Sequence, residues 1–194
     1  MKHGFGRVLA VGGLVVAAAA IRPAAHAAEP LTLTSPAYQD NAVMDVKNSG
    51  NATDVPSCAG GGNLSPPLAW TNPPDGTKSF ALTMVDPEGA SGAGNVHLVT
   101  YGIGPAATSF AERELSQPSD KFVGGKNFRG IGTYFGPCPP AGLGWHHYTL
   151  ILIATDLDPK APELKPGMTR DELLAVLKGH VKGTAGLILR FKHP

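Results

Sequence analysis

The sequence predicts a mostly β domain with one or two helices near its carboxyl end. Apolar, β-prone runs of seven to nine residues recur along the chain, and each is bounded by Pro, Gly or Asp, as strands are. Gly (25 residues) and Pro (18 residues) are frequent, whereas helical periodicity is confined mainly to residues 169–180. These two observations together favour sheets joined by turns over a helical bundle.

Residues 1–27 have the pattern of a secretory signal peptide rather than of folded structure. A basic start is followed by 14 apolar or glycine residues (8–21) and by an Ala-His-Ala cleavage pattern that ends at Ala27. The apolar run is shorter than the roughly 20 residues that span a bilayer. We expect cleavage after Ala27 and a single exported domain over 28–194, periplasmic or secreted; the alternative is an uncleaved amino-terminal anchor.

The charge that remains after cleavage argues against a general binder of nucleic acid or of anionic membranes. Residues 1–27 contain Lys2, Arg7 and Arg22 and no acid, so 13 Lys and Arg remain against 15 Asp and Glu, a net charge of −2. Such binders show a basic excess, so any anion binding must be local. No later apolar run approaches membrane length, so we expect no integral membrane segment in the mature protein.

The predicted strands follow one another along the rest of the chain. Residues 31–35 ("LTLTS") alternate like a half-exposed strand, and 64–70 ("LSPPLAW") are extended because their prolines exclude a helix. Residues 147–155 are apolar on both alternating faces, which predicts a central strand covered on both sides. The four strongest strand candidates are 79–85, 96–103, 147–155 and 185–191.

One segment, "TRDELLAVLKGH", predicts a helix. Thr169 as N-cap and Glu172 three residues later form a capping-box pattern. Leucines within 173–177 give an apolar stripe, and Gly179 or Gly183 can end the helix.

Cys58 and Cys138 are the only cysteines, and each lies beside glycine or proline in a predicted loop. Because export places them in an oxidising compartment, we expect a Cys58–Cys138 disulfide. The alternative is two buried thiols.

Two residues on the predicted strands are candidates for binding chemistry. Asp86 closes an apolar strand, and Pro87 holds it in extended geometry, although an Asp-Pro pair also forms simple turns. His97 lies early in another strand and should face away from its neighbours Val96 and Leu98; its alternative role is that of a hydrogen-bonded core histidine.

The stretch "GPCPPAGLGWHHY" at 136–148 combines a cysteine, three prolines and two histidines. Because successive strand residues point to opposite faces, His146 and Tyr148 should share a face and His147 should point away. The histidines then cannot converge on one ion, and no H-E-x-x-H or paired-cysteine spacing is present, so we expect no metal. A Cys138–His146 catalytic pair would need a free thiolate, and no G-x-S-x-G motif supports a serine nucleophile.

The order "NLSPPLAW … SFALTMVDPEGASG … NVHLVTYGI … GPCPPAGLGWHHYTLILIATD … GHVKGTAGLILRF" resembles the phosphatidylethanolamine-binding protein family, in its bacterial Raf-kinase-inhibitor-like branch. The resemblance covers about residues 31–191. It implies a β-sandwich of two sheets with a β-α-β piece and a C-terminal helix. It also implies a small pocket that binds phosphate-like anions, including phospholipid headgroups.

The resemblance assigns the pocket residue by residue. Trp145 is a candidate aromatic wall, since Val96 stands where the family usually has a large aromatic residue, and His147 stands in place of a usual arginine. The implied ligand-binding residues are Asp86, His97, Pro140, His146 and Tyr148, and the implied pocket-shaping residues are Pro87, Gly136, Pro137 and Pro139.

The function that follows as an expectation is an exported, non-catalytic binding protein for a small anion, with no cofactor. Two alternatives belong to other classes. One is a protein-interaction or inhibitor module that uses the pocket rim. The other is a weak hydrolase in which Asp86 and His97 form an acid–base pair, although no activated nucleophile is visible.

Overall fold

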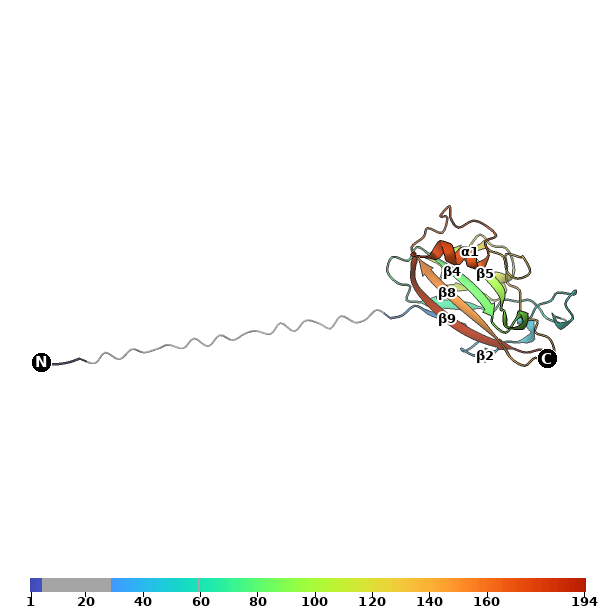
Figure 1. Cartoon of the computed structure of the whole chain (residues 1–194), viewed down its shortest axis with the longest axis horizontal. Coiled ribbons are helices and arrows are strands. Elements are labelled where there is room, and N and C mark those ends of the chain that lie inside the picture. Colours follow the sequence, from blue (N-terminus) through green and yellow to red (C-terminus); the bar gives the residue numbers. More distant parts are fainter. Residues whose placement is uncertain (5–28, 59) are drawn as a thin grey trace.

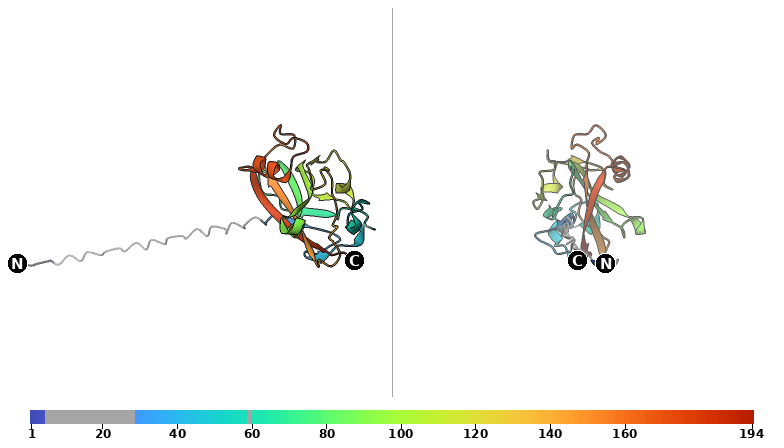
Figure 2. Two further views of the ribbon diagram at one scale, coloured as in Figure 1. Left: turned by 45° about the vertical axis from the view of Figure 1, so that its right-hand side comes forward. Right: turned by 90° about the vertical axis from the view of Figure 1, so that its left-hand side faces the viewer.

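Two β-sheets pack face to face in a computed structural model that describes residues 1–4, 29–58 and 60–194 (Figures 1 and 2). The expected signal-peptide run and its cleavage site lie outside the described residues. All strand pairs are antiparallel except β2–β9, which is parallel. The smaller sheet has the order β1 (Thr32–Thr34), β3 (Leu68–Thr71), β6 (Ser109–Phe110); the larger has the order β2 (Ala42–Val43), β9 (Val181–Phe191), β8 (His146–Thr155), β4 (Ser79–Asp86), β5 (Asn95–Ile103), β7 (Val123–Gly124).

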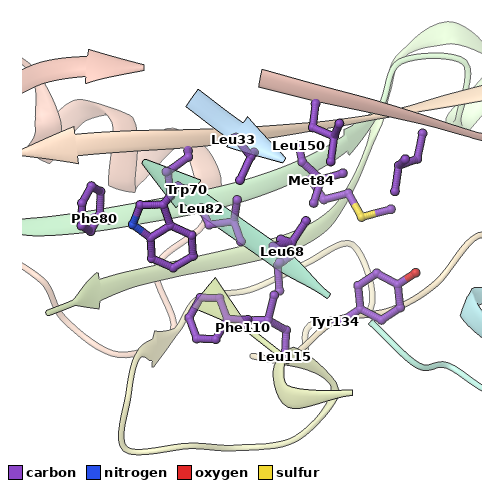
Figure 3. Packing of buried hydrophobic residues seen from close by; sticks show 14 of the residues in the cluster. Leu33, Leu68, Trp70, Phe80, Leu82, Met84, Phe110, Leu115, Tyr134 and Leu150 are labelled. Carbon is purple, nitrogen blue, oxygen red and sulfur yellow. The ribbon is translucent and has the colours of Figure 1, made fainter. Parts of the chain in front are cut away.

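The main hydrophobic core lies between the two sheets (Figure 3). Trp70 of β3 meets Phe80 of the larger sheet and Phe110 of β6, with 5.6 Å between ring centroids in both pairs. Leu82 and Leu150 fill the same layer and are fully buried. This packing confirms the predicted mostly β, two-sheet sandwich.

A second apolar cluster covers the opposite face of the larger sheet. Leu173 and Leu177 of α1 (Arg170–Leu177) pack there with Val99 and Ile153 of the sheet. Strand β8 lies between β9 and β4, with Leu150 in one cluster and Ile153 in the other. The prediction of a central strand covered on both sides is therefore confirmed.

Helix α1 begins at the predicted capping box. The Thr169 hydroxyl accepts a hydrogen bond from the Glu172 N–H, and the Glu172 carboxylate accepts one from the Thr169 N–H at 2.8 Å. Gly179, with φ +87°, follows the last turn. In sequence, α1 follows β8 and precedes β9. The helix expected in the β-α-β piece and the helix expected near the carboxyl end are therefore the same helix. In the described residues no helix follows β9.

The predicted disulfide between Cys58 and Cys138 is present and joins two loops that are 80 residues apart in sequence. The Ser57 hydroxyl donates to the Cys138 carbonyl at 2.8 Å, and the Gly50 N–H donates to the Pro137 carbonyl at 2.9 Å. These contacts anchor the proline-rich loop beside the end of β8. Across the ranges that the structure describes, no helix has the length and apolar character needed to cross a bilayer.

Candidate functional site

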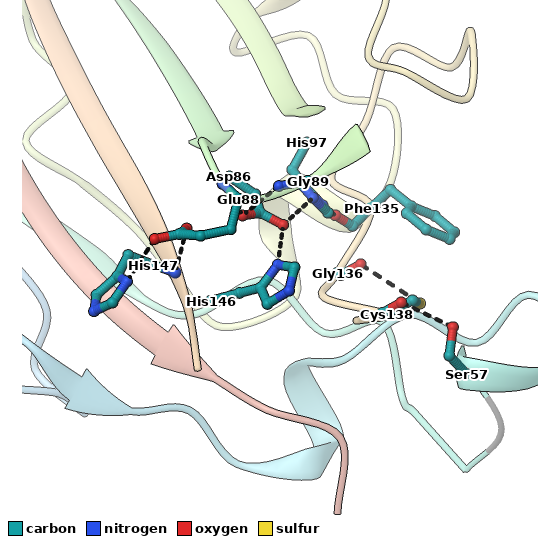
Figure 4. Close-up of polar contacts among 10 residues, drawn as sticks. All are labelled: Ser57, Asp86, Glu88, Gly89, His97, Phe135, Gly136, Cys138, His146 and His147. Atoms are coloured by element: carbon teal, nitrogen blue, oxygen red, sulfur yellow. Dashed lines mark hydrogen bonds and ion pairs between the residues drawn. The ribbon is translucent and has the colours of Figure 1, made fainter. Parts of the chain in front are cut away.

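Four predicted site residues come together where three neighbouring strands of the larger sheet end or begin. Asp86 is the last residue of β4, His97 lies near the start of β5, and His146 and Tyr148 open β8. Because β4 lies between β5 and β8, its end places Asp86 between the two histidines (Figure 4). All four residues are buried, with at most 5% of the residue surface exposed.

The Asp86 carboxylate organises the site through hydrogen bonds. One oxygen, Oδ1, accepts from the backbone N–H groups of Glu88 and Gly89 at 3.0 and 3.1 Å. The other, Oδ2, lies 2.8 Å from His146 Nδ1. Since an ionised carboxylate only accepts, His146 Nδ1 carries the proton, and its Nε2 is left to contact a ligand.

His97 is oriented by a backbone carbonyl. Its Nδ1 lies 2.7 Å from the Phe135 carbonyl oxygen and must donate to it. Its Nε2 is buried, has no hydrogen-bond partner in the described part of the chain, and lies 4.0 Å from Asp86 Oδ2. Buried polar atoms usually have a hydrogen-bond partner, and no protein group in the described residues takes this one, so it is available to a ligand.

A β-bulge aims His97 into the site. Met84 pairs with Leu98 while Val85 pairs with Val96, which leaves His97 as the extra residue. Val96 packs with the cluster under α1, whereas Leu98 belongs to the core between the sheets. His97 meets Tyr148, a member of that same inner core, with 5.1 Å between rings. The expectation that His97 faces away from both neighbours is wrong, because it assumed a regular strand.

The electrostatics of the site disfavour charge on two of its groups. Burial lowers the pKa of His97, although its bond to Phe135 and the nearby Asp86 carboxylate act in the opposite direction. Burial and the Asp86 charge both raise the pKa of Tyr148, so its hydroxyl keeps its proton. That hydroxyl is buried and has no hydrogen-bond partner among the described residues, so it is a second polar atom available to a ligand.

Replacing His97 should make stability less sensitive to acid. A folded-state pKa below the unfolded value means that the His97 contribution is complete above about pH 6.5 and is lost as the pH falls through the folded pKa. We therefore expect the free energy of unfolding of wild type to fall more between pH 7 and 5 than that of His97→Gln. Denaturant melts at several pH values measure this, and parallel curves would contradict it.

The loop of residues 134–138 is held by a residue that sequence reasoning missed. Asn63 Oδ1 accepts from the Gly136 N–H at 2.8 Å, and Asn63 Nδ2 donates to the Tyr134 carbonyl at 3.2 Å. A Cβ on Gly136 would come within 2.1 Å of the Asn48 carbonyl oxygen, so only glycine fits there. Asn63 ends the run "GGGN", which has the composition of an ordinary turn, so no local sequence signal marked this residue.

The aromatic wall beside His97 comes from residues other than the one expected. Phe128 meets the His97 ring at 5.0 Å and Phe135 at 5.4 Å. Trp145 is instead exposed on the surface and contacts Arg190 and Lys192. The expectation that Trp145 forms this wall is wrong, because a side chain adjacent to His146 in sequence points away from the site.

Other predicted residues lie around the cluster in different ways. His147 points away from the site as predicted, and its ring and N–H bind the Glu88 carboxylate at 2.9 and 3.0 Å. Pro139 is buried, whereas Pro140 is exposed beside Pro56 and His193. The assignment of Pro140 as a ligand-binding residue therefore remains a prediction.

In the described residues, one cluster contains three side chains of the types that bind metal ions. Atoms of Asp86, Glu88 and His146 lie within 4.8 Å of one another. Both carboxylates already accept hydrogen bonds from histidines and backbone N–H groups. A hydrogen-bond network accounts for this arrangement without an ion.

Comparison with known proteins places the fold and the site in one family. The family model described as "Phosphatidylethanolamine-binding protein" matches residues 34–192. The chain belongs to the phosphatidylethanolamine-binding protein family. This confirms the resemblance in the sequence and brings Asp86, His97, His146 and Tyr148 all within the matched region.

The chain is similar to bacterial and archaeal proteins. It is 36% identical over 168 residues to lipoprotein LppC of Mycobacterium tuberculosis, covering 87% of this chain and 75% of that protein. It is 37% identical over 130 residues to a UPF0098 protein of Methanothermobacter thermautotrophicus, covering 66% and 82%. The crystal structure of Escherichia coli YbcL, described as a member of the mammalian family, superposes with a TM-score of 0.74 at 26% identity, covering 84% and 99%.

Proposed function

We propose that this protein is an exported, non-catalytic binding protein whose buried cluster takes up a phosphate-like anion, either free or as a phospholipid headgroup. Export is supported by the signal-peptide pattern, by the disulfide and by the similarity to a protein named as a lipoprotein. The family description supports a phospholipid-like ligand.

The observation that carries the proposal is that two buried polar atoms of the site, His97 Nε2 and the Tyr148 hydroxyl, have no hydrogen-bond partner among the described residues. Both lie around Asp86 and His146. A phosphate oxygen accepts from the Tyr148 hydroxyl. A protonated phosphate oxygen donates to the imidazole nitrogens, or the imidazoles take up a proton and donate to the phosphate themselves. Asp86 then contributes by fixing the His146 tautomer rather than by touching the anion.

Replacing His146 should weaken the binding of phosphate and of phosphoethanolamine by roughly tenfold to a hundredfold, because one charge-assisted hydrogen bond is lost. Isothermal calorimetry on wild type and His146→Ala measures this. His147→Ala is the matched control, since its side chain binds Glu88 outside the site and its removal should leave affinity unchanged. Equal affinity of wild type and His146→Ala would contradict the assignment of this cluster as the anion site.

Affinity for the anion should rise as the pH falls below about 6.5, the ordinary histidine pKa. Burial lowers the pKa of His97, and the imidazole donates a stronger hydrogen bond to an anion when it is protonated. The second protonation of a phosphate monoester, near pH 6, acts in the same direction by supplying a donor to a neutral imidazole.

A further inference from the structure

An exposed apolar tip stands beside the site. Leu143 is 64% exposed and lies between Gly142 and Gly144, both with φ +83°. A Cβ added at either glycine would meet nothing within 4 Å, so this part of the loop projects into solvent. Trp145 follows Gly144, is 40% exposed and directly precedes the pocket residue His146.

Two cations, Arg190 near the end of β9 and Lys192 just after that strand, lie over the same tryptophan. Arg190 Cζ is 5.3 Å and Lys192 Nζ is 4.9 Å from the centre of the Trp145 ring. Arg190 Nε also donates to the Asn41 carbonyl at 2.8 Å, which fixes its position. We call Leu143, Trp145, Arg190 and Lys192 together the Trp145 patch. Two acidic side chains near this edge already have partners: His147 binds the Glu88 carboxylate, and Asp40 Oδ1 accepts from the Ile188 N–H.

We propose that the Trp145 patch docks the protein on an anionic lipid bilayer. Leucine and tryptophan at a protruding tip suit the interface between headgroups and acyl chains, and the flanking cations suit lipid phosphates. The net charge outside the signal-peptide region is −2, so the attraction has to come from this local patch. Docking would place the mouth of the pocket at the headgroups, and this last step rests on the proposed function.

Tryptophan fluorescence tests the proposal, because the chain has only two tryptophans and Trp70 is buried in the core. Vesicles of phosphatidylcholine with phosphatidylglycerol should shift the Trp145 emission to the blue, phosphatidylcholine alone should shift it far less, and added salt should reverse the shift. Vesicle affinity should fall roughly twenty-five-fold in Arg190→Gln/Lys192→Gln, at about fivefold per charge. In Leu143→Ser it should fall roughly tenfold.

Lys182→Gln is the matched control, since Lys182 is an exposed cation near the other end of β9. It should bind vesicles as wild type does. Thermal melts of the patch variants separate loss of docking from loss of fold. A wild-type emission that no vesicle shifts, or vesicle affinity that both patch variants retain, would overturn the proposal, as would capture of the patch by a protein in place of lipid.

Titration with free phosphoethanolamine separates the patch from the pocket. The patch variants should keep wild-type affinity for the free headgroup, while His146→Ala should lose it and still dock on anionic vesicles. Anionic vesicle binding without any headgroup binding in wild type would overturn the proposed pocket function and leave the patch standing. Headgroup binding without vesicle binding would do the reverse.

Discussion

Removing the disulfide should lower the free energy of unfolding by about 4 kcal/mol, because the bridge closes a loop between residues 80 apart in sequence and restricts the unfolded chain. For a domain of this size that corresponds to a fall in melting temperature of roughly 8 to 16 °C. Thermal and urea melts of wild type and Cys58→Ala/Cys138→Ala measure the difference. Reduced wild type should melt close to the double variant.

The control is reductant added to the double variant, which should change nothing. We also expect the double variant to bind phosphate more weakly, because Cys138 anchors the loop whose Phe135 carbonyl orients His97. Identical melting temperatures for the oxidised wild type and the double variant would show that the loop contacts alone hold this region.

Asp86→Ala should destabilise the fold by about 3 to 5 kcal/mol, since it removes a buried carboxylate that accepts from three donors, of which only the Gly89 N–H also reaches the Asp86 carbonyl, at 3.2 Å. Those donors are the N–H groups of Glu88 and Gly89 and the Nδ1–H of His146. Urea melts at neutral pH measure the loss. The side chain is almost fully buried, so water cannot readily replace it.

Asp86→Asn is the conservative partner of that experiment. Its amide oxygen can keep the turn bonds to Glu88 and Gly89, while its amide nitrogen would donate to His146 Nδ1 and move the His146 proton to Nε2. We expect most of the stability to return and the nitrogen-15 NMR shifts of the His146 ring to report the reversed tautomer. Equal destabilisation by Asn and Ala would contradict the hydrogen-bond account and assign the effect to the charge of Asp86.

Much of the architecture follows from local pattern. Alternation and composition located the strongest strands, although β9 begins at Val181 rather than at 185. The capping box located the start of α1. The two-residue strands β2, β6 and β7 had no sequence signal, because so short a pairing depends on its partner strand rather than on its own residues.

Part of the site was likewise predictable from local pattern, and part was not. The two-residue period of a strand was enough to place His146 and Tyr148 on one face and His147 on the other, as β8 has them. Asp86 was a candidate from its place at a strand end before proline, and the family resemblance assigned it to the same pocket as His146, to which it is hydrogen-bonded. Trp145, offered as a substitute for an aromatic residue that this sequence lacks, is exposed instead, and the ligand role of Pro140 remains a prediction.

The sequence by itself determined the class of fold, the helix, the paired cysteines and the strand face that carries His146. Only the tertiary structure decided how His97 enters the site, because a bulge exists only when β5 is paired with β4. The same holds for the Phe135 carbonyl on His97 and for Asn63 on the proline-rich loop, which join residues far apart in the chain. Strand periodicity and capping act over a few residues and can be recognised in sequence, whereas the register and hydrogen bonds that complete this pocket arise only when distant segments pack together.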